Sequence, residues 1–143
     1  MKSKILVFLQ FFIIFLMILP LGNDVTYKMA GFVVFVLGGV IGLSAILQHQ
    51  RGNFNIRPDI KEDCVLVQEG IYKYIRHPMY LSVLTMMGAF VLLYPTLYEV
   101  ILYLFLLVTL LVKLLYEESL WQCHTPEYEA YKKKSKRLIP FIF

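Results

Sequence analysis

Residues 79–112 read MYLSVLTMMGAFVLLYPTLYEVILYLFLLVTLLV, a stretch in which Glu99 is the single charged residue. A bilayer core about 30 Å thick needs roughly 20 apolar helical residues to cross it. Because backbone amides in lipid must be satisfied internally, this stretch is predicted to be helical. Proline ends or kinks a helix at the preceding residue, so Tyr94-Pro95-Thr96 predicts a tight turn between spans at 77–94 and 97–115.

Two further uncharged runs, residues 5–21 and 29–47, predict helical spans at about 4–21 and 28–48. The first run is longer than the apolar part of a signal peptide, which has about 7–15 residues, so we expect it to be retained. Gly38 and Gly42 have the small-xxx-small spacing that lets helix backbones approach closely. The sequence therefore predicts an all-α fold, a polytopic transmembrane bundle of about four spans that forms a single domain over residues 1–143.

The composition supports a membrane protein over a soluble one. The chain is 59% hydrophobic and 17% charged, whereas an average soluble domain is about 25% charged. Its two cysteines and three histidines have no spacing typical of a disulfide framework or a metal site, so we predict no metal.

The distribution of Lys and Arg predicts the orientation in the membrane. Two lie at the N-terminus, five in the loop 49–76 and five in the tail 116–143, whereas the opposite side carries only Lys28. Both termini and the 49–76 loop are therefore predicted to be cytoplasmic, in what we expect to be a prokaryotic inner membrane. Since orientation accounts for the basic residues, no nucleic-acid partner is expected. The tail also has a helical pattern over 116–136, and its aromatic residues Tyr116, Trp121, Tyr128 and Tyr131 suit the membrane interface.

Polar groups concentrate where the 49–76 loop meets the third span. Pro78 suits the first turn of a helix, where its missing N–H is not needed. The N–H groups of that turn, with Arg76 and His77, would form an anion site. The alternative interpretation is a topogenic charge followed by a helix start.

A second polar cluster, Lys113 with Glu117 and Glu118, lies at the end of the fourth span. Lys113 and Glu117 are four residues apart and share a helix face. Adjacent Glu117 and Glu118 cannot face the same direction, so at most one is expected to point into a pocket. An ionisable group near membrane depth indicates function by default, and the alternative is a solvated helix end with a weak surface ion pair.

Taken in order, these motifs resemble the isoprenylcysteine carboxyl methyltransferase family, which is related to the phospholipid N-methyltransferases. The resemblance covers about residues 52–143 and rests on Leu66-Val67, Gly70-Ile71-Tyr72, Arg76-His77-Pro78-Met79-Tyr80, Glu117-Glu118, Glu127-Tyr128-Glu129-Ala130-Tyr131 and Arg137-Leu138-Ile139-Pro140. Two features depart from the family pattern. Thr125-Pro126 replaces a frequent Phe-Gly, and Lys113 stands where arginine is common, which removes a bidentate grip on a carboxylate.

The resemblance implies methyl transfer that depends on S-adenosylmethionine, in a cytoplasmic cofactor pocket closed by a C-terminal interfacial helix. It places the cofactor against Cys64, Val65, Leu66, Val67, Tyr72, His77, Pro78, Met79, Tyr80 and Glu117. Lys113 would contact a lipophilic substrate that enters from the bilayer, and Lys113 and Glu117 would be the catalytic pair. The implied reaction is carboxyl O-methylation of an isoprenylcysteine-like group.

Other functions remain open at this level. A phospholipid ethanolamine N-methyltransferase is the alternative enzyme, and a non-catalytic membrane protein that keeps the fold is the alternative outside enzymes. A transporter is disfavoured because no charged residue lies at the middle of any span. A bundle this small could also form a homo-oligomer that shields its lipid-facing gaps.

Overall fold

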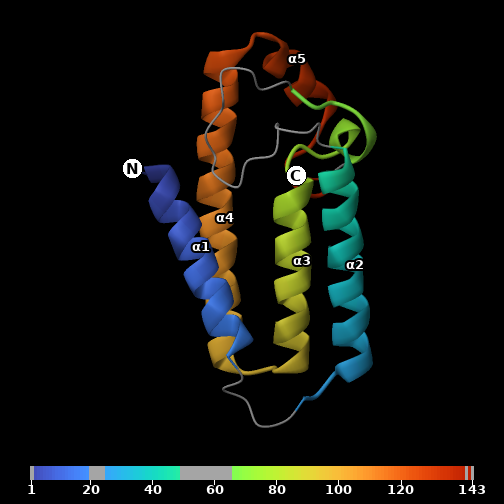
Figure 1. Cartoon of the computed structure of the whole chain (residues 1–143), viewed down its shortest axis with the longest axis vertical. Coiled ribbons are helices and arrows are strands. Elements are labelled where there is room, and N and C mark those ends of the chain that lie inside the picture. The colour runs from blue at the N-terminus through green and yellow to red at the C-terminus, as the bar shows by residue number, and fades with distance from the viewer. Residues whose placement is uncertain (1, 20–24, 49–65, 141, 143) are drawn as a thin grey trace.

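The computed structural model describes residues 2–19, 25–48, 66–140 and 142 (Figure 1). Its elements are helices α1 (Lys2–Ile18) and α2 (Lys28–Leu47), the 3₁₀ helix η1 (Gly70–Lys73), and helices α3 (Pro78–Leu93), α4 (Leu97–His124) and α5 (Glu127–Lys134). Within the described ranges the chain is helical apart from turns and one isolated bridge between Ile75 and Lys136. The predicted all-α class is confirmed.

The four long helices run alternately up and down, with α4 between α1 and α3, and α2 packed on the other side of α3 (Figure 1). The start of α1, the end of α2, the start of α3 and the end of α4 all lie at the same end of the bundle, together with α5 (Figure 1). The beginning of the chain and its C-terminal tail are therefore on one side, an arrangement that the predicted orientation requires.

Among the residues that the structure describes, two helices, α2 and α4, are long and apolar enough to cross a membrane. The helix α3 has 16 residues, about 24 Å at 1.5 Å per residue, so the crossing of all four helices stays a prediction. Large apolar side chains are exposed along α2, among them Phe32, Leu37, Val40 and Leu43. Contiguous exposed apolar surface of this kind is typical of contact with a membrane or another protein.

Glycines bring α2 close to α3, as the small-xxx-small spacing predicts. A Cβ at Gly38 would lie 2.6 Å from Met86 Cγ and 2.8 Å from Met86 N, and one at Gly42 would lie 2.5 Å from Ser82 Oγ. The Ser82 hydroxyl donates a 2.7 Å hydrogen bond to the carbonyl of Gly38. The pairing therefore depends on small residues and on a hydrogen bond that crosses the interface.

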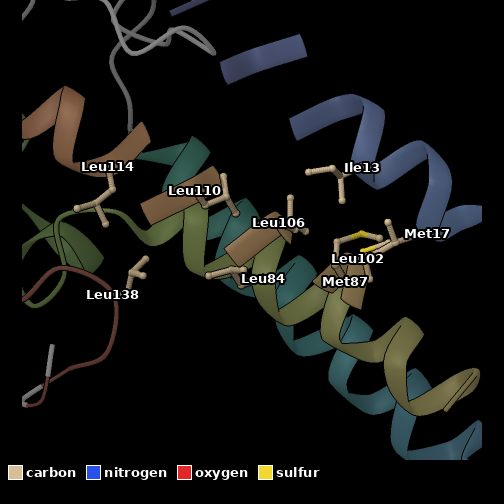
Figure 2. Packing of buried hydrophobic residues seen from close by; sticks show 9 residues of the cluster. All are labelled: Ile13, Met17, Leu84, Met87, Leu102, Leu106, Leu110, Leu114 and Leu138. Atoms are coloured by element: carbon tan, nitrogen blue, oxygen red, sulfur yellow. The ribbon is translucent and has the colours of Figure 1, made fainter. Parts of the chain in front are cut away.

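The apolar core joins α1, α3 and α4, and Figure 2 shows its nine residues converging from these helices and from the tail. They are Ile13, Met17, Leu84, Met87, Leu102, Leu106, Leu110, Leu114 and Leu138. Leu106, Leu110 and Leu114 recur at every fourth position of α4 and are fully buried, so one stripe of α4 forms the centre of this core.

The tail differs from the single helix predicted for 116–136. The helix α4 continues to His124 and α5 begins at Glu127, because proline lacks an N–H and forces the preceding residue into an extended conformation. Thr125 accordingly has φ −144° and ψ 132°. Beyond the break α5 folds back, so that the rings of Trp121 and Tyr128 stack with centroids 6.2 Å apart. Tyr128 and Tyr131, expected at the membrane interface, are buried instead.

The residues after α5 lie beside the segment that leads into α3. Lys136 N–H donates to Tyr74 O at 2.9 Å, Arg76 N–H to Lys136 O at 2.7 Å and His77 N–H to Arg137 O at 3.0 Å. We call residues 135–138 the C-terminal strap. It fixes the residues immediately before Pro78, which begins α3 as predicted.

Candidate functional site

The two polar clusters meet at the shared end of the bundle, where α3 begins and the apolar part of α4 ends. Tyr80 Oη donates a 2.7 Å hydrogen bond to Glu117 Oε2. The His77 ring stacks on the Tyr80 ring with centroids 5.3 Å apart and planes 7° from parallel. His77 Nδ1 lies 3.9 Å from Glu117 Oε2. Thus the fold brings the predicted site residue Glu117 to His77 and Tyr80, which precede it by 40 and 37 positions in the chain.

Glu118, which was not among the predicted site residues, lies in a buried ionic cluster beside them. Its Oε1 accepts a hydrogen bond from Arg76 Nε at 2.8 Å, and its Oε2 accepts one from Arg137 Nε at 3.1 Å. His77 Nε2 lies 3.6 Å from Glu118 Oε1. Both glutamates therefore approach His77, one near each ring nitrogen. Which of them faces a pocket stays a prediction. The side chains of adjacent residues diverge by about 100° around a helix. The His77 ring lies between the diverging side chains of Glu117 and Glu118, so each carboxylate approaches a different ring nitrogen.

The Arg76 side chain forms its hydrogen bonds with other residues of the protein. Besides its bond to Glu118, its Nη1 donates to the carbonyl oxygens of Ser135 at 2.5 Å and Lys132 at 3.2 Å. The Lys132 carbonyl lies in the last turn of α5, and the Ser135 carbonyl lies at the start of the strap. The guanidinium thus links α4, the segment before α3 and the tail, instead of supplying an open anion site as the sequence suggested.

Lys113 lies one turn deeper in the bundle than Glu117 and is almost completely buried, with 1% of its surface exposed. Its Nζ donates a 2.8 Å hydrogen bond to Gln10 Oε1 of α1 and lies 5.1 Å from the centroid of the Tyr80 ring. Lys113 and Glu117 are both described, and no ion pair within 4.0 Å joins them. The shared helix face therefore directs both side chains toward Tyr80 without pairing them with each other.

Buried tyrosines surround this cluster. Tyr131 Oη donates a 2.6 Å hydrogen bond to the carbonyl of Tyr72. Burial raises the pKa of Tyr131 to about 12, against smaller lowering effects of the Ser135 hydroxyl and the Arg76 charge. Burial first, and then the negative charge of Glu117, hold the pKa of Tyr72 well above its ordinary value. At neutral pH both phenols are therefore uncharged hydrogen-bond donors.

The other predicted cofactor-binding residues have different positions. Pro78 is buried, whereas Met79 is half-buried at the start of α3. Leu66 and Val67 are half-buried before η1. Cys64 and Val65 lie outside the described residues.

Two buried polar atoms at the site have no hydrogen-bond partner among the residues that the structure describes, His77 Nε2 and Tyr128 Oη. A buried polar group without a partner is unfavourable by roughly 1–3 kcal/mol, so such atoms are few and are typical of positions completed by a ligand or water. With the partly exposed carboxylate of Glu117, they provide donors and an acceptor for a polar ligand. The residues present therefore fit a cofactor with hydroxyl, amino and ring-nitrogen groups.

Two elements of the site could not be found from the sequence. Gln10 had no signal beyond being the one polar residue in a long apolar run, and Arg137 was visible only as part of the basic-Leu-Ile-Pro motif. Both lie far from their partners in the chain, 103 residues from Lys113 and 19 residues from Glu118.

Comparison with known proteins identifies the family. The sequence model of the isoprenylcysteine carboxyl methyltransferase family matches residues 29–122, about two thirds of the chain. No curated protein and no solved structure matched the chain. The matched region includes α2, α3 and most of α4, and with them His77, Tyr80, Lys113 and Glu117. This chain therefore belongs to the isoprenylcysteine carboxyl methyltransferase family, and its family implies a membrane-associated methyltransferase.

Proposed function

We propose that this protein is an S-adenosylmethionine-dependent membrane methyltransferase that methylates the carboxyl group of a lipophilic acceptor, such as an isoprenylcysteine. Family membership supports the methyl transfer. One observation supports the carboxyl acceptor, the buried ammonium group of Lys113, which no carboxylate in the described part of the chain pairs within 4.0 Å.

The cofactor side of the proposal rests on the cluster of His77, Tyr80 and Glu117. When bound, S-adenosylmethionine supplies a methyl group on a positively charged sulfur. Tyr80 Oη donates a 2.7 Å hydrogen bond to one carboxylate oxygen of Glu117. The Glu117 carboxylate can still accept hydrogen bonds from the amino or hydroxyl groups of a ligand. The His77 ring is held by stacking on Tyr80, and its buried Nε2 can donate to or accept from a polar ligand. Tyr72, buried nearby, stays neutral and adds no competing negative charge.

Lys113 determines the acceptor in this proposal. Its Nζ is a hydrogen-bond donor only, held by the Gln10 amide oxygen and the Tyr80 ring face, both of which favour the cationic form. A buried cation attracts an anionic acceptor and repels an ammonium group. A carboxylate also needs no proton removed before it attacks a methyl group, whereas an ethanolamine ammonium does. The site therefore favours carboxyl O-methylation over phospholipid N-methylation.

The position of the site suits a lipophilic acceptor. Leu110 and Leu114, which flank Lys113 on α4, are completely buried and exclude water from its apolar side. Large apolar side chains such as Phe8, Phe15 and Leu104 are exposed on α1 and α4. We propose that these faces contact lipid, and that the acceptor's hydrocarbon chain stays in the bilayer while its carboxylate reaches Lys113. We further propose that this end of the bundle is cytoplasmic.

Isothermal titration of the detergent-purified protein with S-adenosylmethionine tests the cofactor. We expect micromolar binding by the wild type and at least tenfold weaker binding by Glu117→Gln, which keeps the shape but removes the charge. Glu129→Gln, on the exposed surface of α5, is the matched control and should bind as the wild type does. A well-folded wild type that does not bind S-adenosylmethionine would contradict the proposal.

Methyl transfer to N-acetyl-S-farnesylcysteine in detergent, compared with transfer to phosphatidylethanolamine in mixed micelles, tests the acceptor. Carboxyl methylation yields a base-labile ester, whereas N-methylation does not. We expect base-labile product from the farnesylated carboxylate. Transfer to the phospholipid amine alone would favour the alternative enzyme.

A further inference from the structure

The helix α1 contributes a polar side chain to the site although it lies outside the region that the family model matches, 29–122. Between Ile5 and Leu19 every residue of the chain is apolar except Gln10. Gln10 is buried on the same face of α1 as Ile13 and Met17, both of which pack into the core against α4. The polar group thus lies on the helix face that meets α4 and not on the face exposed to lipid.

A buried amide in an apolar helix is unfavourable unless it is hydrogen-bonded, so the partner of Gln10 accounts for its place there. Lys113 Nζ lies 2.8 Å from Gln10 Oε1. Because a lysine ammonium can only donate, the amide oxygen of Gln10 must be the atom that faces it. A neutral acceptor holds the ammonium without cancelling its charge, which a carboxylate at this position would do.

The geometry then connects α1 to the cluster that we propose binds the cofactor. The same Nζ lies over the Tyr80 ring with 5.1 Å to its centroid, and Tyr80 Oη bonds to Glu117 at 2.7 Å. Lysine side chains have several rotatable bonds and about 2 kcal/mol of rotamer entropy. Two contacts, one from α1 and one from α3, restrict that freedom at the point where an acceptor would meet the cation.

We propose that Gln10 is a positioning residue, which holds the Lys113 ammonium as a buried cation with its charge intact and thereby selects an acceptor with a carboxylate. This inference rests on the proposed function for the role of Lys113, but it concerns a residue and a helix that the family match does not include. It assigns acceptor recognition partly to α1, whereas the cofactor cluster lies on α3 and α4.

The test compares two probes, N-acetyl-S-farnesylcysteine and its carboxamide, which differ only in the charge of the recognised group. Their binding to the detergent-purified protein is measured by isothermal titration, and KM and kcat for methyl transfer are measured for the acid. The variants are Gln10→Glu, which keeps the shape and adds a charge that pairs with Lys113, and Gln10→Met, which removes the acceptor atom. Met17→Leu, a volume-conserving change on the same buried face of α1, is the matched control.

We expect the wild type to prefer the acid over the amide by at least about tenfold, as for a hydrogen bond to a charged group. Gln10→Glu should abolish this preference without lowering thermal stability, because the new carboxylate satisfies Lys113 in place of the acceptor. Gln10→Met should raise KM for the acid about tenfold with S-adenosylmethionine binding unchanged. The double variant Gln10→Met/Lys113→Met should bind the acid no more weakly than Lys113→Met alone.

A purely structural role for Gln10 predicts a different result, since Gln10→Glu would then keep full preference for the acid. That result, or a wild type that binds acid and amide equally, overturns the inference while leaving methyl transfer intact. The proposed function fails separately, if S-adenosylmethionine does not bind. In that case the acid-to-amide preference and its loss in Gln10→Glu still decide the role of Gln10.

Discussion

Replacing Glu118 by glutamine removes the negative charge at the centre of the ionic cluster while keeping the shape of the side chain. The carboxylate is 95% buried, and it joins Arg76 of the segment before α3 to Arg137 of the strap. Arg76 in turn holds the carbonyls of Lys132 and Ser135. The charge on Glu118 therefore stabilises both the strap and the backbone of His77, which the strap holds through the carbonyl of Arg137.

The size of the effect follows from the burial of each partner. The Arg76 side chain is 6% exposed, and leaving a buried charge without its partner is destabilising by about 3–5 kcal/mol. Arg137 is 32% exposed, so its pair contributes only about 0–1 kcal/mol after screening by solvent. Because glutamine still accepts one hydrogen bond, we expect the lower end, about 3 kcal/mol, which is roughly a hundredfold in the population of opened strap.

Hydrogen exchange measured by mass spectrometry on peptides from 66–80, which contain Arg76, and from 127–140, which contain Lys136, reports this opening. The Arg76 N–H donates to the Lys136 carbonyl at 2.7 Å, and the Lys136 N–H donates to the Tyr74 carbonyl at 2.9 Å. Hydrogen exchange at both N–H groups should accelerate about a hundredfold in Glu118→Gln. Glu129→Gln, which changes an exposed glutamate on α5, should exchange at the wild-type rate. An exchange rate for Glu118→Gln within about threefold of the wild type would refute the role assigned to the cluster.

Three further predictions concern other parts of the molecule. Gly38→Leu should separate α2 from α3 and lower the thermal midpoint in detergent, because even a Cβ there meets Met86 N at 2.8 Å; Gly39→Leu, where a Cβ meets nothing within 4 Å, is the control. In the variant Cys64→Ser, the exposed Cys123 should react with an impermeant maleimide in inside-out vesicles and not in intact cells, and the reverse pattern would invert the proposed orientation. Folding that raises the pKa of Tyr131 from 10 to about 12 contributes stability that is fully present below pH 10 and is lost as the pH rises toward 12. Tyr131→Phe should therefore be less stable at pH 8 by about 1 kcal/mol, for the lost hydrogen bond, and should lose less stability than the wild type between pH 10 and pH 12 in denaturant titrations.

The sequence by itself determined the helices and their order. Long uncharged runs bounded by charges or proline define α2, α3 and the start of α4 to within a few residues, since a segment in lipid must satisfy its backbone groups internally. The turn at Pro95 and the helix start at Pro78 followed from the geometry of the proline ring. These are local features, in which each residue constrains the chain beside it.

The motif residues were also visible in the sequence, although their partners were not. His77, Tyr80 and Glu117 stood out as polar groups at the ends of apolar helices, and the tertiary structure places them within contact distance. Whether they bind the cofactor remains a prediction. The sequence left open which of Glu117 and Glu118 faces a pocket, because one residue's charge indicates nothing about burial until its partners are known.

Only the tertiary structure decided which charges are paired. The Glu118 cluster joins residues 76, 118 and 137, and the Lys113 ammonium bonds to Gln10 103 positions away. Such pairings depend on how whole helices pack, through the glycine contacts of α2, the leucine stripe of α4 and the break at Pro126 that turns α5 back. The physical reason is that helix formation depends on near neighbours and on the surrounding solvent. The partner of a buried charge is instead selected by the packing of segments distant in the chain.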